Sequence, residues 1–381
     1  MNKERILVAI SGGVDSAVVA VLLKQKGFDV VGCILQMHDL SKSIKSQKSI
    51  DDAHILCEKI GIDLIVKDVT VDFKNTVQEY FYQEYLKGRT PNPCVLCNNK
   101  LKWKSLIDVA NNLNIEKIAT GHYARIIHPP NPLRKREQLS DRSGVINHAP
   151  TNRSIILKSS DSKKDQTYML WQLPQEYLRR TIFPLGDFEN KDKVRKFAQE
   201  NNIPFFDKSD SQDICFIDDN DYRKFLTEYS AENNKTEEIS QGNIILDEKI
   251  IGTHSGYPFY TVGQRKGLGI AYKQPLYVRN IDAQKNEIEV AIFENTFSNG
   301  LIASEINLIK YEDLPNEKDF LVRIRYKDLG GIANCKVVDN KLFVNFYEPR
   351  NAVTVGQSVV LYDENELVGG GIIESIINYK L

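Results

Sequence analysis

The sequence predicts an α/β fold in which helices cover both faces of a parallel sheet, followed by a C-terminal β-barrel. Apolar, strand-like runs alternate with helical stretches through the first half of the 381 residues. From about residue 206 the pattern changes to short aromatic and β-branched runs separated by Gly, Asp and Ser turns. The length is sufficient for two or three domains, and the change of pattern places a boundary near residue 206.

The first element is the continuous apolar run 6–10, which is typical of a parallel strand buried on both faces. A turn follows it, and then an apolar helix that ends at Gly27. The other strands and helices of this half are expected at 28–35, 49–60, 63–69, 71–87, 94–112, 116–120, 166–173 and 191–202. The polar, proline-containing stretch 127–152 is expected to be a flexible surface insertion. The β-runs of the barrel are expected at 276–278, 287–292, 321–326, 341–346, 358–362 and 371–377.

The composition is that of an ordinary globular protein, with 41% hydrophobic and 27% charged residues. No window approaches the roughly 20 apolar residues of a membrane span, and MNKER leads directly into a strand. Six cysteines are too few for a disulfide scaffold, so we expect a cytoplasmic protein without membrane contact. The net charge of −1 gives no overall nucleic-acid signature, but local basic clusters such as Arg134–Arg136 and Arg265-Lys266 leave RNA binding open.

The turn Ser11–Ser16 has the features of a phosphate cradle. Its glycines let backbone N–H groups approach an anion, and the following helix contributes its partly positive N-terminus. The lysine of a Walker A loop is absent. SGGVDS resembles instead the PP-loop of adenine nucleotide alpha hydrolase-like enzymes. These split ATP between the α and β phosphates, adenylate a carbonyl-type oxygen and displace AMP with nitrogen or sulfur. The resemblance implies that Asp15 and Ser16 help to hold pyrophosphate and Mg²⁺; the alternative is a tight turn without a ligand.

Two cysteines stand close together in GRTPNPCVLCNNK. Asn92 is a plausible N-cap and Pro93 a natural first helical residue, so Cys94 and Cys97 fall in the first turns and share one face. We expect the helix N-terminus to lower the pKa of both thiols, helped by two nearby cations, Arg89 and Lys100.

This pair has three possible roles: structural zinc, a redox pair, or sulfur chemistry. Zinc normally takes four ligands, and the chain has no second C-x-x-C. Next to an adenylating loop, the pair favours sulfur as the nucleophile that replaces AMP. The remaining cysteines are Cys215, in SDSQDICF, and three at apolar positions that we expect to be buried small hydrophobes, Cys33, Cys57 and Cys335.

Taken together, the chain resembles the MnmA/TrmU family of tRNA-specific 2-thiouridylases over nearly its full length. The matching segments are SGGVDS (11–16), GRTPNPCVLCN (88–98), ATGHYAR (119–125), KKDQTYML (163–170), SDSQDICFI (209–217), YTVGQRKGLGI (260–270), RIRY (323–326) and VGQSVVLYD (355–363). The resemblance implies a PP-loop domain at residues 1–205, a small central domain at 206–280 and a C-terminal β-barrel at 281–381. It also implies ATP-dependent 2-thiolation of the wobble uridine of tRNA. The C2 oxygen is adenylated, and sulfur from a cysteine persulfide then replaces it, releasing AMP and pyrophosphate.

The resemblance also implies roles for single residues. Cys215 carries the persulfide and Cys97 is its partner nucleophile; a disulfide between them is one outcome of the transfer. ATP with Mg²⁺ is bound by Ala9, Ile10, Ser11, Gly12, Gly13, Val14, Asp15, Ser16, Leu35 and Gly121. Asn92, Pro93 and Cys94 contact the target base, and further contacts with the tRNA anticodon stem-loop come from His122, Lys164, Asp165, Gln166, Arg325, Tyr326 and Gln357. The implied partners are tRNA and a sulfur-donor protein or cysteine desulfurase, with the chain acting as a monomer.

One departure from the family pattern bears on the cofactor. Position 94 is Asp in the better-known members and Cys here, so Cys94, Cys97 and Cys215 could together hold a [4Fe–4S] cluster. Two other functions stay open from the sequence. One is another adenylating PP-loop enzyme, such as an amidating ligase, although no glutaminase-like domain is recognisable. The other is an inactive tRNA-binding protein.

Overall fold

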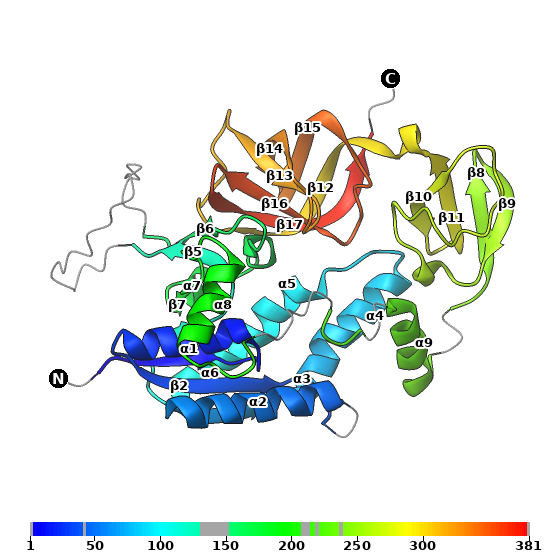
Figure 1. Ribbon diagram of the computed structural model, residues 1–381. Helices are drawn as coiled ribbons and strands as arrows, with labels where there is room; N and C mark the ends of the chain where they lie inside the picture. The colour runs from blue at the N-terminus through cyan, green and yellow to red at the C-terminus, as the bar shows by residue number, and fades with distance from the viewer. Residues whose placement is uncertain are drawn as a thin grey trace.

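The computed structural model describes residues 3–40, 43–129, 152–206, 214–217, 221–235 and 239–378, which form three units in chain order (Figure 1). Most of the expected insertion, residues 130–151, lies outside this part, as does the basic cluster Arg134–Arg136. Ile127, at the start of that expected insertion, is the last residue of a strand, β5 (Ala124–Ile127).

The N-terminal unit contains a five-stranded sheet whose paired strands are all parallel, which confirms the predicted α/β fold. Its strand order is β3 (Asp63–Asp68), β2 (Asp29–Gln36), β1 (Arg5–Ala9), β4 (Lys117–Ala119) and β7 (Thr181–Ile182). Ile6 and Val8 pack into the core beneath α1 (Val14–Gln25), α2 (Ile44–Ile60) and α8 (Lys191–Glu200). Leu7 packs into the core on the opposite face, so the central strand is buried on both sides.

Two long helical stretches connect β3 to β4. The first contains α3 (Thr70–Phe73), η1 (Lys74–Gln78) and α4 (Glu79–Leu86), and the second contains α5 (Pro93–Cys97), η2 (Asn98–Trp103) and α6 (Lys104–Asn112). Both stretches were predicted, but their middle segments, η1 and η2, are π-helical. A π-turn inserts one extra residue, so side chains five positions apart come towards the same face.

One predicted helix is wrong. Residues 166–173 form a short 3₁₀ turn, η3 (Thr167–Met169), followed by further turns before α7 (Gln175–Leu178). Tyr168, Leu170 and Trp171 are fully buried in a core that also contains barrel residues. Their apolar spacing therefore reflects burial between two units rather than one face of a helix.

The central unit begins with α9 (Tyr222–Glu232) and contains a four-stranded sheet. Its order is β10 (Leu276–Asp282), β11 (Glu287–Ile292), β8 (Gly242–Leu246) and β9 (Lys249–His254), and a short turn, η6 (Tyr257–Phe259), follows β9. The runs 276–278 and 287–292, which we had assigned to the barrel, belong to this sheet, and the expected boundary at 280/281 falls inside β10. A local β-pattern cannot show which sheet a strand joins, because the pairing of β11 with β8 is long-range.

The C-terminal unit is a closed six-stranded β-barrel, as predicted. After the turn η7 (Phe293–Thr296), its strands follow the order β12 (Phe297–Leu308), β15 (Lys341–Asn351), β14 (Gly331–Val338), β13 (Asp319–Arg323), β16 (Ser358–Asp363) and β17 (Glu366–Ile377), and β17 pairs with β12 to close it. β17 also pairs with β6 (Ile155–Lys158), whose other neighbour is β5, so the barrel continues into a hairpin of the N-terminal half.

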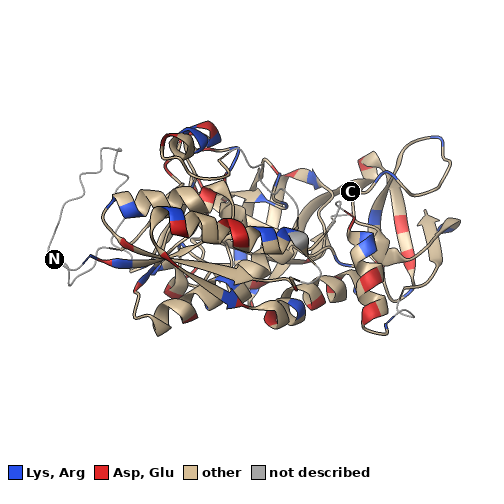
Figure 2. Ribbon diagram, turned by 60° about the horizontal axis from the view of Figure 1, so that its bottom comes forward, with Lys and Arg blue, Asp and Glu red and all other residues tan. Residues whose placement is uncertain are grey.

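The described helices include none that is long and apolar enough to cross a membrane. Lys and Arg are interspersed with Asp and Glu along the ribbon rather than gathered at one end, as expected for a net charge near zero (Figure 2).

Candidate functional site

The PP-loop turn joins β1 to α1 at the carboxyl edge of the sheet, where ligands bind in open α/β folds. Gly13 is the N-cap of α1, and the Ser16 hydroxyl accepts a hydrogen bond from the Ser11 N–H at 3.0 Å and donates one to the Gly13 carbonyl at 3.1 Å. Gly12 has a φ of +68°, and a Cβ there would lie 2.5 Å from the Ser49 carbonyl oxygen of α2. The turn is therefore held in a fixed, anion-ready conformation.

The remaining expected nucleotide residues surround this turn. Leu35 lies near the end of β2 and is half-buried. Gly121 follows β4, and a Cβ there would lie 3.1 Å from the Ser16 nitrogen. The Asp15 carboxylate is already engaged: its Oδ1 accepts from the Tyr123 hydroxyl at 2.7 Å and lies 2.6 Å from the Lys191 ammonium of α8.

The structure brings the three candidate cysteines together. Cys94 and Cys97 lie on α5, and Cys97 packs in a cluster that includes Leu101 and against which Phe216 packs. Phe216 is the neighbour of Cys215 in the described segment 214–217, and its ring contacts Phe73 of the same cluster. All six cysteines are free, and Cys33, Cys57 and Cys335 are buried as predicted.

The expected lowering of the thiol pKa values is wrong. Desolvation raises the pKa of Cys94 and of Cys97, and it raises that of Cys215 to about 12; the positive charge of Lys102 opposes this in all three. Lys102 therefore takes the place that we had given to Arg89 and Lys100. Arg89 instead forms an ion pair with Glu84 at 2.7 Å.

Lys102 lies five residues after Cys97, within η2, so the π-turn rotates it towards the cysteine face. It has no ion-pair or hydrogen-bond partner among the residues that the structure describes. Cys94 and Lys102 are desolvated by protein yet only half-buried, and Cys215 is exposed, as expected for side chains recessed below the surrounding surface. Sequence spacing gave no sign of this role, because an α-helix would place residues 97 and 102 on different faces.

His122 lies between the PP-loop turn, which its neighbour Gly121 contacts, and Lys102 of the cysteine site. Its ring centroid lies 5.2 Å from that of Trp103, and its Nδ1 lies 2.9 Å from the Thr120 hydroxyl. Desolvation, together with the charge of Lys102, lowers the pKa of His122 to about 3, so its imidazole is neutral. A neutral ring can stack or accept a hydrogen bond but brings no positive charge to RNA.

The expected tRNA-contact segment 164–166 is partly occupied by internal contacts. Asp165 is buried and accepts hydrogen bonds from the Ser159 N–H at 3.1 Å and the Thr167 hydroxyl at 2.8 Å. Gln166 exchanges two 2.9 Å hydrogen bonds with the backbone of Tyr123. Lys164 is half-buried.

Asn92 precedes α5 as its N-cap residue, and Pro93 occupies the first turn, as expected. The Asn92 side chain does not cap the helix; its amide donates to the Met169 sulfur at 3.6 Å.

The barrel reaches this site through two segments. Tyr326 packs against the shared core, and burial and the nearby charge of Asp165 raise its pKa, while Arg325 is exposed. Gln357 donates to the Thr90 carbonyl at 3.0 Å and more weakly to that of Pro91 at 3.3 Å. The Thr90 N–H donates to the Val355 carbonyl at 2.9 Å. The barrel thus holds the segment that leads to Asn92.

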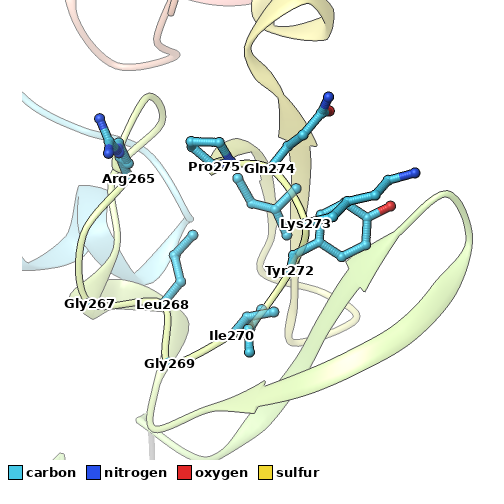
Figure 3. A pocket seen from close by; sticks show the side chains of 11 residues that line it. Arg265, Gly267, Leu268, Gly269, Ile270, Tyr272, Lys273, Gln274 and Pro275 are labelled. Carbon is cyan, nitrogen blue, oxygen red and sulfur yellow. The ribbon is translucent and has the colours of Figure 1, made fainter.

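Two further features lie apart from this chemistry. A pocket in the central unit is lined by Arg265 and by residues 267–276, which include Lys273 but no cysteine or PP-loop residue (Figure 3). Within the described residues, no group of three or more His, Cys, Asp or Glu side chains could hold a metal ion. A [4Fe–4S] cluster on Cys94, Cys97 and Cys215 therefore stays a prediction.

Comparisons with known proteins agree with this architecture. Three family models match consecutive parts of the chain: a tRNA methyl transferase HUP domain at residues 4–219, a tRNA methyl transferase PRC-barrel domain at 223–292 and an aminomethyltransferase beta-barrel domain at 298–373. The chain is 42% identical to tRNA-specific 2-thiouridylase MnmA of Salinibacter ruber, over 98% of this chain and 95% of the relative. It is 38% identical to the MnmA of Carboxydothermus hydrogenoformans, over 98% of both.

Among solved structures, the U34-tRNA thiolase NcsA from Methanococcus maripaludis with its [4Fe-4S] cluster aligns with a TM-score of 0.36 and 16% identity, over 62% of this chain and 69% of that one. That likeness is too low to assign a cluster here. The full-length identity to the two bacterial relatives decides the family: the chain belongs to the tRNA-specific 2-thiouridylase (MnmA) family.

Proposed function

We propose that this chain is an ATP-dependent tRNA-uridine 2-sulfurtransferase that replaces the C2 oxygen of the wobble uridine with sulfur. One observation carries the proposal: Cys215, from a distant segment, lies with Cys94, Cys97 and Lys102. The charge of Lys102 also acts on His122, whose neighbour Gly121 packs against the PP-loop turn. Family membership and the PP-loop support ATP with Mg²⁺ and tRNA as the other reactants.

The first step is activation. The C2 oxygen attacks the α-phosphorus of ATP, pyrophosphate leaves, and the proton of uridine N3 passes to solvent. The backbone N–H groups of Ser11–Ser16 and the N-terminus of α1 stabilise the negative charge of the phosphates. A uridine in an anticodon loop can be splayed out towards the site, since single-stranded bases are not locked in a duplex.

The second step is sulfur transfer. The terminal sulfur of a Cys215 persulfide attacks C2 and AMP leaves, giving a disulfide between Cys215 and the base. The Cys97 sulfur then attacks the Cys215 Sγ, releases 2-thiouridine and forms a Cys97–Cys215 disulfide. The proton of the Cys97 thiol restores N3–H, and an external thiol reductant supplies two electrons to reopen the disulfide.

Lys102 suits the anions of this second step. Burial keeps the three thiols protonated near neutral pH, so its ammonium has no thiolate partner at rest. A persulfide is more acidic than a thiol, and its anion would provide the missing partner. Lys102 thus favours the charged sulfur when it is loaded.

The test compares Cys215→Ser with Cys335→Ser, a buried cysteine of the barrel, by mass spectrometry of wobble nucleosides. Cys215→Ser should abolish 2-thiouridine while leaving tRNA binding within twofold, and Cys335→Ser should still produce it. Unchanged 2-thiouridine in Cys215→Ser would refute the persulfide assignment. Binding of tRNA by the wild type without ATP consumption would favour an inactive tRNA-binding protein.

Three finer features belong to this proposal as predictions. A sulfur-donor protein or cysteine desulfurase should load Cys215, and the chain should elute as a monomer in size-exclusion chromatography. The cluster alternative is tested by anaerobic reconstitution: without retained iron, and with full activity from persulfide alone, the cluster has no role.

A further inference from the structure

The PP-loop lacks a lysine of its own, but the fold brings one to it. Lys191 is the first residue of α8, 176 positions after Asp15 in the sequence, and its Nζ lies 2.6 Å from the Asp15 Oδ1. The ammonium also lies 5.7 Å from the centre of the Tyr123 ring. Asp15 is in the first turn of α1, where the phosphates of ATP are expected.

The surrounding structure fixes the positions of both Lys191 and Asp15. The Lys191 side chain is only 9% exposed, and its backbone N–H donates to the Asp161 carboxylate at 3.1 Å. Asn190 caps α8 by accepting from the Lys193 N–H at 3.0 Å. The Asp15 side chain is 27% exposed, so a ligand arriving at the turn can reach it.

The pairing leaves the Asp15 Oδ1 with two donors, Lys191 and the Tyr123 hydroxyl. A Mg²⁺ ion coordinated by that carboxylate would repel an ammonium 2.6 Å from the same oxygen. An anion that arrives with the metal would be attracted to this ammonium, whose side chain is only 9% exposed. The phosphates of the nucleotide are the anions that accompany the metal.

We propose that Lys191 binds the pyrophosphate end of ATP, exchanging Asp15 for the β- and γ-phosphate oxygens when the Mg²⁺ complex arrives. This inference deepens the proposed function and rests on it for the identity of the nucleotide. Lys191 would supply the positive charge that a Walker A loop carries within its own motif.

The experiment measures binding of ATP, AMP and inorganic pyrophosphate, each with Mg²⁺ and without tRNA, by calorimetry on the full chain. Lys191→Met should weaken ATP and pyrophosphate at least tenfold and leave AMP within twofold, because AMP lacks the two phosphates. Lys193→Met, on the same helix but exposed and paired with Glu189, should bind all three like the wild type.

Two results would overturn the inference. A parallel loss of ATP and AMP affinity would mean that Lys191 only supports the shape of the turn, and unchanged ATP affinity would mean that it does not contact the nucleotide. If Lys191→Met does not fold, Lys191→Arg, which keeps the charge, should retain the preference for ATP over AMP, and its loss would count against the proposal. The binding assay contains no tRNA, so it tests the contact between Lys191 and ATP independently of whether the chain makes 2-thiouridine.

Discussion

The N-terminal unit and the C-terminal barrel each hold a lysine below the surface, in opposite electrostatic situations. In the barrel, Lys310 is 10% exposed and is paired with Asp363 and Glu366. In the N-terminal unit, Lys102 faces three protonated thiols and has no partner among the described residues. The paired charge of Lys310 stabilises the folded state, whereas the charge of Lys102, unpaired among those residues, destabilises it. This difference is expected if Lys310 has a structural role and Lys102 binds an anion that is present only during the reaction.

The largest effect should come from removing the barrel charge. Lys310→Met would remove the ammonium that Asp363 and Glu366 share, while Lys318 still pairs with Asp363, and should lower the free energy of unfolding by about 3 kcal/mol. Urea denaturation at pH 7 measures this. A loss below 0.5 kcal/mol would show that solvent screens the charges of Lys310, Asp363 and Glu366, and it would contradict the proposed difference between Lys310 and Lys102.

Lys102→Met should behave in the opposite way. It removes a desolvated cation without a partner, so stability should stay equal or rise, while the single-turnover rate of sulfur transfer falls about 100-fold, equivalent to about 2.7 kcal/mol. Lys104→Met, an exposed neighbour, is the control. A marked loss of stability in Lys102→Met with normal sulfur transfer would contradict the comparison.

The barrel also contacts the Thr90 segment, which leads to Asn92. Gly356 has a φ of +91°, and a Cβ there would lie 3.0 Å from Arg89 Cβ and from the Thr90 nitrogen and oxygen. Gly356→Ala should slow thiolation about tenfold, or about 1.4 kcal/mol, by displacing the residues before Asn92. Gly27→Ala has the same φ strain at +92° but no atom within 4 Å, so it should lose about 1 kcal/mol of stability and keep its rate. Equal thiolation rates in the two variants would show that the contact between Gly356 and residues 89–90 contributes only to packing.

The smallest effect concerns acid. Burial alone would raise the pKa of Asp363, but hydrogen bonds from Lys310, Lys318 and Tyr311 outweigh it and hold the pKa at about 2. Because this lies below the unfolded value near 3.9, the stabilisation is present above pH 4 and disappears as the pH falls through 2. The wild type should exceed Asp363→Asn by about 1 kcal/mol at pH 7, allowing for solvent screening, and the gap should close near pH 2. A gap independent of pH would contradict the assignment.

The sequence predicted the features that depend on local chemistry. The strand, glycine turn and helix at residues 5–25 appear where expected, and Gly61 ends α2 in the left-handed conformation. Cys33, Cys57 and Cys335 are buried, as their apolar positions indicated. In each case the determining residues are neighbours in the chain.

The features that the sequence did not predict depend on long-range contacts or on one extra residue. The π-turn in η2 aligns Lys102 with the cysteines, and nothing in NNKLKW marks that turn. Lys191 reaches Asp15 only because α8 packs against α1. Desolvation overrode the expected helix effect on the thiols, because burial is decided by segments as distant as Phe216.

The pairing of β17 with β6 has a consequence for how the chain is made. The same core contains Leu7 near the start of the chain and Ile372 near its end. During synthesis on a ribosome, the edge of β6 and the apolar surface of this shared core are therefore exposed until β17 has left the ribosome. A fragment that stops before the barrel should aggregate, and nascent chains should need a chaperone late in synthesis.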